Sequence, residues 1–149
     1  MSRRKPPRRL GVESLELRAN PATYAVTSID DVVNPADDAT NFTLREAVDA
    51  ANNATNPGLI TDGRHRILFS PTIAAGSQIT LTSGELLLNP WNGEISIIGL
   101  GRDRLTISGN NTSRIFNIAA GVNADVSGLT LADGLATSGG AILNNGTLS

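Results

Sequence analysis

Six charged residues in the second half of the sequence could support chemistry: Arg102, Asp103, Arg104, Arg114, Asp125 and Asp133. Carboxylates bind calcium, and a basic side chain can take a proton from a substrate. Asp103 and Asp125 stand 22 residues apart, so a repeat of similar length would bring them to the same side. Calcium takes about six to eight oxygen ligands, and two isolated carboxylates do not supply them. We therefore predict solvated turn residues here, and we assign no catalytic, metal-binding or cofactor-binding residue in this sequence.

Two further features could suggest a site and fail on inspection. Gly99-Leu100-Gly101 resembles the start of a phosphate-binding loop, but Arg104 occupies the place of the third glycine and no helix pattern follows. We expect a turn there. His65 is the only histidine and stands between two arginines, so we expect an exposed loop histidine without a catalytic role.

The polar turns add two weaker signals. Trp91 follows a proline, and we expect it to pack over an edge of the structure rather than to present a sugar platform. An Asn-X-Ser/Thr sequence arises easily in turns rich in Asn and Thr, and we infer no glycosylation from the five that begin at Asn41, Asn53, Asn110, Asn111 and Asn145.

Composition limits the class of protein. The chain has 149 residues, which suffices for one domain, and 40% of them are hydrophobic while only 3% are aromatic. A core built from Ile, Leu, Val and Ala in small similar layers favours a repetitive fold. Cysteine is absent, which excludes disulfides, thiolate metal sites and cysteine nucleophiles.

The charge is divided unevenly along the chain. The first eighteen residues hold six of the twelve Lys and Arg, and the remainder carries six basic against twelve acidic residues. An acidic body argues against nucleic acid as a partner. We predict a disordered basic tail with a sorting-like segment over residues 1–22, and a folded domain over residues 23–149. No apolar run is long enough to span a bilayer.

The folded part must position its residues around one predicted helix, from Thr43 to Asn53. Thr43 and Glu46 have the spacing of a capping box. Four apolar residues then recur at helical spacing and form one stripe, namely Leu44, Ala47, Val48 and Ala51. So short a helix is unstable alone in water. We expect it to dock on an apolar surface near residues 67–69 or 79–81.

After Pro57-Gly58 the sequence changes to short apolar runs, each of about three to five residues, separated by Gly, Asn, Ser or Pro. We expect strands at residues 24–29, 67–69, 79–81, 86–88, 95–98, 105–107, 115–118, 124–126, 129–131 and 141–143. The recurring phrases predict an all-β fold, a parallel β-solenoid with the helix as its N-terminal cap. Residues 144–149 look like the start of another coil, so we expect a fragment whose open end invites self-association.

The helix and the phrases after it resemble a known family. Thr43-Leu44-Arg45-Glu46-Ala47-Val48 is similar to the "SLREAI" motif that opens many bacterial right-handed parallel β-helix surface proteins, the CSLREA-type domain. Residues 139–148 resemble the "GGAI.N.GTL" phrase of polymorphic outer-membrane-protein-like β-helices, and residues 12–18 loosely resemble an "LE-LE-R" sorting segment. The resemblance covers most of the chain from Leu10 onward. It implies a right-handed parallel β-helix, a solenoid like that of pectate lyases, in a secreted or outer-membrane-associated surface protein. It brings no catalytic residue.

Two main functions follow as hypotheses, and a passive stalk segment with no ligand is a third. The first is a non-enzymatic β-helix scaffold for adhesion or display, whose partner is an unknown surface ligand, with carbohydrate as one class. The alternative is the N-terminal part of a β-helix polysaccharide lyase or hydrolase whose active site lies beyond this fragment. The two differ in whether the protein turns over an acidic polysaccharide.

Overall fold

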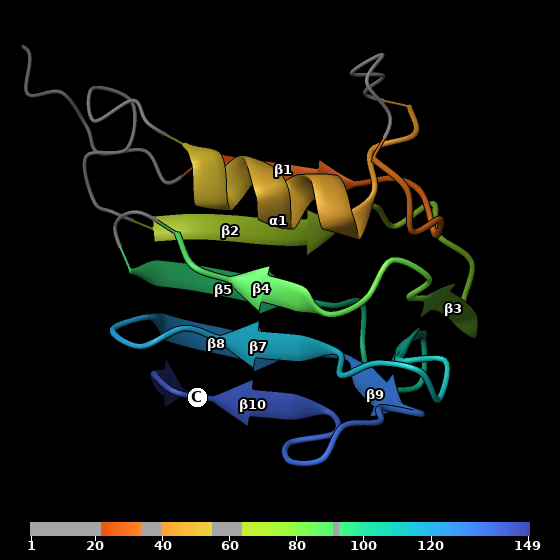
Figure 1. The fold of residues 1–149 in the computed structure, drawn as a ribbon. Helices are drawn as coiled ribbons and strands as arrows, with labels where there is room; N and C mark the ends of the chain where they lie inside the picture. The colour runs from red at the N-terminus through yellow and green to blue at the C-terminus, as the bar shows by residue number, and fades with distance from the viewer. Residues whose placement is uncertain (1–21, 34–39, 55–63, 91–92) are drawn as a thin grey trace, which may run out of the picture.

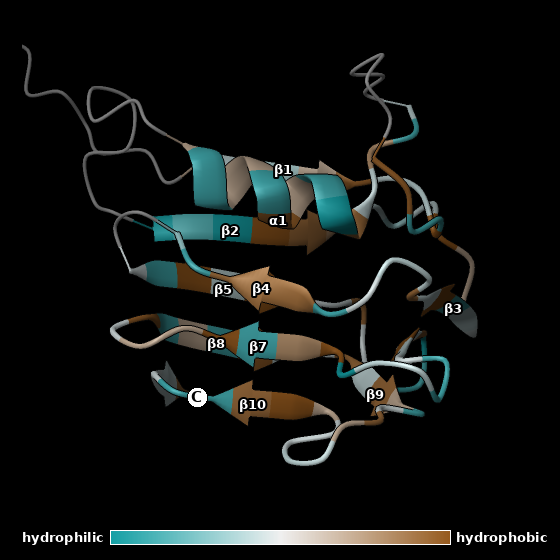
Figure 2. Ribbon diagram, viewed as in Figure 1, coloured by the Kyte–Doolittle hydropathy of each residue, from teal (hydrophilic) through white to brown (hydrophobic). Residues whose placement is uncertain are grey.

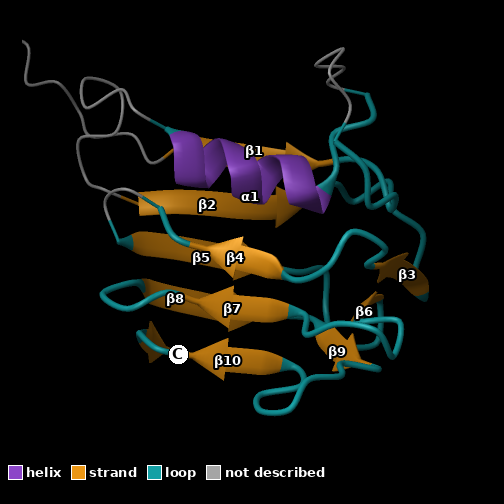
Figure 3. Ribbon diagram, in the orientation of Figure 1, coloured by secondary structure: helices purple, strands orange, loops and turns teal. Residues whose placement is uncertain are grey.

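The computed structural model describes residues 22–33, 40–54, 64–90 and 93–149. These ranges form one helix and eleven short strands (Figure 3). The elements are β1 Ala22–Val26, α1 Leu44–Asn53, β2 Arg64–Phe69, β3 Ser77–Thr80, β4 Leu86–Leu88, β5 Glu94–Ile98, β6 Leu105–Ser108, β7 Phe116–Ile118, β8 Asn123–Ser127, β9 Thr130–Ala132, β10 Ile142–Asn144 and β11 Thr147–Leu148.

The predicted strand positions are confirmed, most of them to within two residues at each end. The strand expected at residues 24–29 is β1, which begins and ends earlier. Ala22 belongs to β1, so the strand crosses the predicted boundary between tail and domain. The predicted tail otherwise lies outside the described residues, as does Trp91.

The strands form three parallel sheets. The first has five strands in the order β1-β2-β5-β8-β11, and the other two have three strands each, β4-β7-β10 and β3-β6-β9. From β2 onward the chain visits the three sheets in turn, so strands that are neighbours in a sheet come from successive passages. Figure 1 shows β4, β7 and β10 one below another, with α1 above β4.

The predicted class, an all-β right-handed parallel β-helix solenoid, is wrong. The described strands make three small separate sheets of five, three and three strands, and these sheets are not closed. Helix α1 packs against them and supplies four residues of the common core. Parallel sheets combined with a packed helix belong to the α/β class. The recurring apolar runs correctly predicted short parallel strands. Their spacing along the sequence does not determine how the sheets are arranged relative to one another.

Alternate residues of the short strands share one hydrophobic core. Ile79 of β3 lies opposite Ile107 of β6, which lies opposite Leu131 of β9. Leu86 of β4 has Phe116 of β7 beside it in the same way. These columns of aliphatic side chains explain how a chain with few aromatic residues builds a continuous core.

The turns between strands approach one another closely. The amide of Gly99 donates to the carbonyl of Ser127 at 2.8 Å, and the amide of Gly101 donates to the carbonyl of Gly128 at 2.9 Å. A Cβ atom on Gly99 would overlap the Gly128 carbonyl oxygen. Successive passages of the chain therefore touch through backbone atoms at this position.

Helix α1 begins and docks as predicted. Thr43 is the N-cap, and both bonds of the capping box with Glu46 are present. Its apolar stripe is buried, and its principal contacts are with β1, β2 and β4. The expected contact with residues 67–69 fits these contacts, whereas residues 79–81 are not among the principal ones. This helix, the only one in the described ranges, is too short and too polar to cross a membrane.

Burial of the helix stripe can be tested at Val48, whose side chain is 1% exposed. We expect Val48→Asp to lower the free energy of unfolding by about 3 kcal/mol or more, because a carboxylate replaces a buried apolar group. Asp49→Ala, at the exposed neighbouring position, should change it by less than about 0.5 kcal/mol. Urea unfolding followed by circular dichroism measures both, and equal midpoints would show that α1 is not docked.

Candidate functional site

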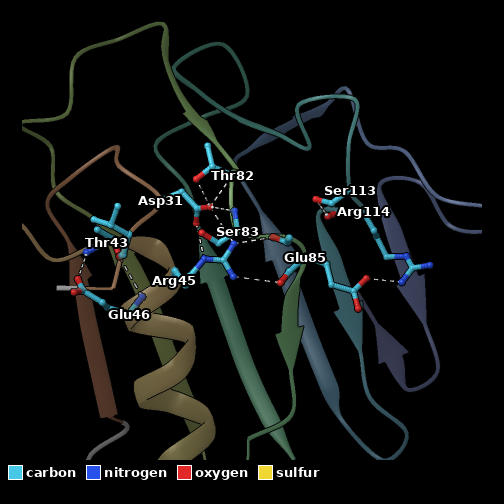
Figure 4. Close-up of polar contacts among 11 residues, drawn as sticks. Asp31, Thr43, Arg45, Glu46, Thr82, Ser83, Glu85, Ser113 and Arg114 are labelled. Atoms are coloured by element: carbon cyan, nitrogen blue, oxygen red, sulfur yellow. Dashed lines mark hydrogen bonds and ion pairs between the residues drawn. The ribbon is translucent and has the colours of Figure 1, made fainter. Parts of the chain in front are cut away.

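The least exposed charged side chain among the ion pairs of the described residues is that of Asp31, in the segment after β1. Its side chain is 1% exposed and that of Arg45 is 13% exposed. The guanidinium of Arg45 donates twice, from Nε to Oδ1 at 2.7 Å and from Nη2 to Oδ2 at 3.1 Å. This is a two-point ion pair between the segment before α1 and the first turn of the helix, as Figure 4 shows.

Both members of the pair also bind the backbone that leads into β4. The amides of Thr82 and Ser83 donate to Oδ2 of Asp31 at 2.6 and 3.0 Å. Arg45 Nη2 donates to the carbonyl of Gly84 at 2.7 Å. The ion pair therefore joins three separate pieces of chain. The hydrogen bonds of its carboxylate and guanidinium groups are made to other groups of this protein.

The surroundings of Asp31 lower its pKa. Burial by itself raises the pKa, but the hydrogen bonds from Arg45, Thr82 and Ser83 and the charge of Arg45 together outweigh it. The carboxylate is consequently ionised at neutral pH. A buried ionised group with these partners is suited to holding structure together rather than to donating a proton.

The helix cap holds the same segment from the other side. The hydroxyl of Thr43 donates to the carbonyl of Val32 at 2.8 Å. Thr27 and Phe42 exchange bonds, since the Phe42 amide donates to Oγ1 of Thr27 at 2.9 Å and the Thr27 amide donates to the Phe42 carbonyl at 2.8 Å. The start of α1 thus fixes the segment that carries Asp31.

A second ion pair has a similar role further along the chain. Arg114 Nη1 donates to Oε2 of Glu85, and its other nitrogens donate to the carbonyls of Ser138 and Gly139 at 2.9 and 2.8 Å. Asn117 Nδ2 donates to the remaining oxygen of Glu85 at 2.8 Å. Arg114 was expected in a solvated turn, but its side chain is only 13% exposed, and it is a structural residue that anchors the loop before β10.

The outward side of the five-stranded sheet carries the other group of polar residues, which we name the outer face: Arg64, Arg66, Glu94, Ser96, Asn123 and Asp125. The register places Arg64 beside Glu94 beside Asn123, and Arg66 beside Ser96 beside Asp125. Arg64 Nε donates to Glu94 Oε2 at 3.0 Å. An open hollow of about 220 Å³ lies over part of this face. It is lined by five of the six residues together with Ile95, Ala124, Thr147 and Ser149.

His65 contradicts the prediction of an exposed loop histidine. It lies in β2 with a fully buried side chain, and its ring stacks on Tyr24 with centroids 6.1 Å apart. Strand alternation explains the burial, because successive side chains of β2 point to opposite faces. Arg64 and Arg66 are exposed, whereas His65 and Ile67 are buried. Figure 2 shows this strand as hydrophilic in its first half and hydrophobic in its second. Burial also raises the pKa of the Tyr24 hydroxyl.

The predicted acidic candidates do not meet. Arg102 and Asp103 are exposed in the turn before β6, where they form a loose pair at 3.8 Å. Asp125 lies in β8 opposite Ser96. Asp133 has a φ of 52° and accepts a hydrogen bond from the Ser108 hydroxyl at 3.1 Å. The described ranges bring no three His, Cys, Asp or Glu side chains together as a metal site.

The glycine motif and two of the sequons lie in turns. The amide of Arg104 donates to the Gly101 carbonyl at 2.9 Å, which confirms the predicted turn after β5. Asn110 and Asn111 have φ values of 56° and 52°, a left-handed conformation that asparagine tolerates better than most residues. This position agrees with the expectation that Asn-X-Ser/Thr sequences arise here because turns are rich in Asn and Thr.

Comparisons with protein-family models, with curated proteins and with solved structures give no match for this chain. The site is therefore interpreted from its own geometry. No motif in the sequence marks Asp31 or Arg45: Asp31 stands in a polar stretch, and Arg45 lies outside the apolar stripe of the helix.

The ion pair predicts a specific pH dependence. Because the pKa of Asp31 is lower when the protein is folded, its stabilising effect is present above the unfolded value of about 3.9 and is lost as the pH falls through the folded value. Asp31→Asn should lower the free energy of unfolding at pH 7 by about 3 kcal/mol, because it leaves Arg45 buried without its charge partner.

The matched control is Asp30→Asn at the adjacent exposed position, which we expect to cost less than about 1 kcal/mol. Denaturant unfolding across the acid range measures the three proteins. The difference between wild type and Asp31→Asn should shrink as the pH falls below about 4. A difference that stays constant through that range would contradict the role given to the Asp31 charge.

Proposed function

We propose that this protein is a non-enzymatic scaffold, secreted or displayed at the cell surface, that holds a polar face for adhesion. One observation carries the proposal: charged side chains of the two least exposed ion pairs in the described residues bind the backbone of this same protein. Asp31 and Arg45 bind residues 82–84, and Arg114 binds residues 138–139. Groups held in this way define shape, whereas a catalytic acid or base needs access to a substrate proton.

The outer face is the surface we assign to ligand contact. Its residues are polar side chains on three neighbouring parallel strands, β2, β5 and β8, with strand spacings of about 4.8 Å. Rows of carboxylate, amide, hydroxyl and guanidinium groups suit an extended ligand rich in hydroxyl groups, so carbohydrate is the ligand class we propose. The acidic body of the chain supports this over nucleic acid.

The surface location rests on the sequence resemblance of residues 43–48 and 139–148 to bacterial surface proteins. On these phrases alone we propose that the chain is related to the CSLREA-type proteins. The proposal does not extend to their β-helix fold.

An acidic-polysaccharide lyase or hydrolase is the alternative, and turnover separates the two. Incubating the protein with pectin and calcium should give no unsaturated sugar product and no new reducing ends. Formation of either, in proportion to protein and time, would overturn the non-enzymatic proposal.

Adhesion has its own test on a panel of insoluble polysaccharides. If the wild type is retained on one of them, Asp125→Ala should weaken retention by about tenfold, the effect of losing one hydrogen bond to a charged group. Asp103→Ala removes an equally charged side chain from an exposed turn away from the outer face and should leave retention unchanged. Equal effects of the two substitutions, or no retention on any material, would count against the outer face as the contact surface.

A further inference from the structure

Strand β4 lies at the end of its sheet, and only one of its edges faces another strand. The Leu86 amide donates to the Ile115 carbonyl at 2.8 Å, and the Leu88 carbonyl accepts from the Ala119 amide at 3.1 Å. Leu86 and Leu88 therefore direct their backbone groups toward β7. Since these directions alternate along a strand, Leu87 and Asn89 direct theirs to the opposite edge.

The side chain of Asn52 binds that opposite edge at two points. Its Nδ2 donates to the Leu87 carbonyl at 2.8 Å, and its Oδ1 accepts from the Asn89 amide at 2.9 Å. In a parallel sheet, one residue of a neighbouring strand donates and accepts in this same pattern, on either side of the residue that it faces. The carboxamide of Asn52 thus reproduces the backbone amide and carbonyl of a single strand residue beside Leu88.

Arg45 continues this cover toward the start of the strand. Its Nη2 and Nη1 donate to the carbonyls of Gly84 and Glu85 at 2.7 and 3.4 Å. Arg45 and Asn52 are seven residues apart, which is two helical turns, so both project from the same side of α1. One helix therefore supplies side-chain partners to the edge from Gly84 to Asn89, at the place where a further strand would pair.

We propose that Asn52 keeps the edge of β4 closed to strand addition, and that this edge, when uncovered, accepts strand β10 of a second copy of the chain. Strand β10 lies at the other end of the same sheet and is parallel to β7. The Phe116 amide donates to the Ala141 carbonyl at 3.0 Å, so Ile142 and Asn144 direct their backbone groups away from β7.

The register makes a second copy the fitting partner. Leu86 and Ile142 both lie opposite Phe116, and Leu88 and Asn144 both lie opposite Ile118. A β10 strand placed against β4 of another copy would extend one parallel sheet with its alternation of inward and outward residues unchanged. Edge strands pair with other chains in this way when nothing blocks them. The inference needs no ligand and is independent of the adhesive function.

The test compares Asn52→Ala with Asn53→Ala in the full chain. The side chain of Asn53 bonds only within the helix, to the Asp49 carbonyl at 2.9 Å, so it is a matched control. Sedimentation equilibrium over a concentration series measures association. We expect an association constant at least about tenfold larger for Asn52→Ala than for wild type, and no change for Asn53→Ala. Amide hydrogen exchange should show the Asn144 amide slowing as the assembly forms.

A cooperatively folded Asn52→Ala protein that associates no more than the control would overturn the proposal, as would association without added protection at Asn144. If Asn52→Ala does not fold, the wild type decides. Its Asn89 amide should be protected from exchange together with the amides of α1, because its acceptor is a side chain of that helix. An Asn89 amide that exchanges without protection would overturn the proposal.

Discussion

The buried ion pair between Asp31 and Arg45 is the constraint on which the rest of the structure depends. Removing two charges from water costs several kcal/mol each, and the cost is offset only where every lone pair and N–H finds a partner. Here the partners are backbone groups of residues 82–84. The segment after β1, the first turn of α1 and the approach to β4 are therefore fixed together, and each would lose its place without the other two.

A second constraint is the small size of the strands. Strands of two to six residues form few ladder bonds and bury few side chains. They are stable only in groups, with aliphatic columns such as Ile79, Ile107 and Leu131 running across a sheet. A sheet built in this way has two edges, and at the β4 edge side chains of α1 take over the hydrogen bonds that a strand would make.

Local sequence signals predicted the local structure well. The Thr43 capping box, the helix stripe and the positions of the short strands all follow from rules of spacing that act within a few residues. The assembly of the sheets could not be predicted in the same way, because alternation sets which face of a strand is buried but not how separate sheets meet. The predicted solenoid failed at that step.

The polar residues show the same limit. Arg45 has the sequence context of a solvent-facing helix residue, and Asp31 stands among polar loop residues. Their pairing depends on a contact across fourteen residues that no local pattern encodes. His65 was missed for a different reason, since the alternation of Arg64, His65, Arg66 and Ile67 already indicated a strand that starts before the apolar run.

The close approach of the turns at Gly99 and Gly128 has a consequence for how such a sequence can change over time. Where two backbones touch, the distance between successive passages is set by peptide geometry and is the same whatever side chains surround it. A side chain at either glycine is therefore excluded, whereas outward side chains such as those of Ser96 and Asn123 can be replaced without altering this spacing. A chain organised in this way can acquire a new surface without altering its internal spacing.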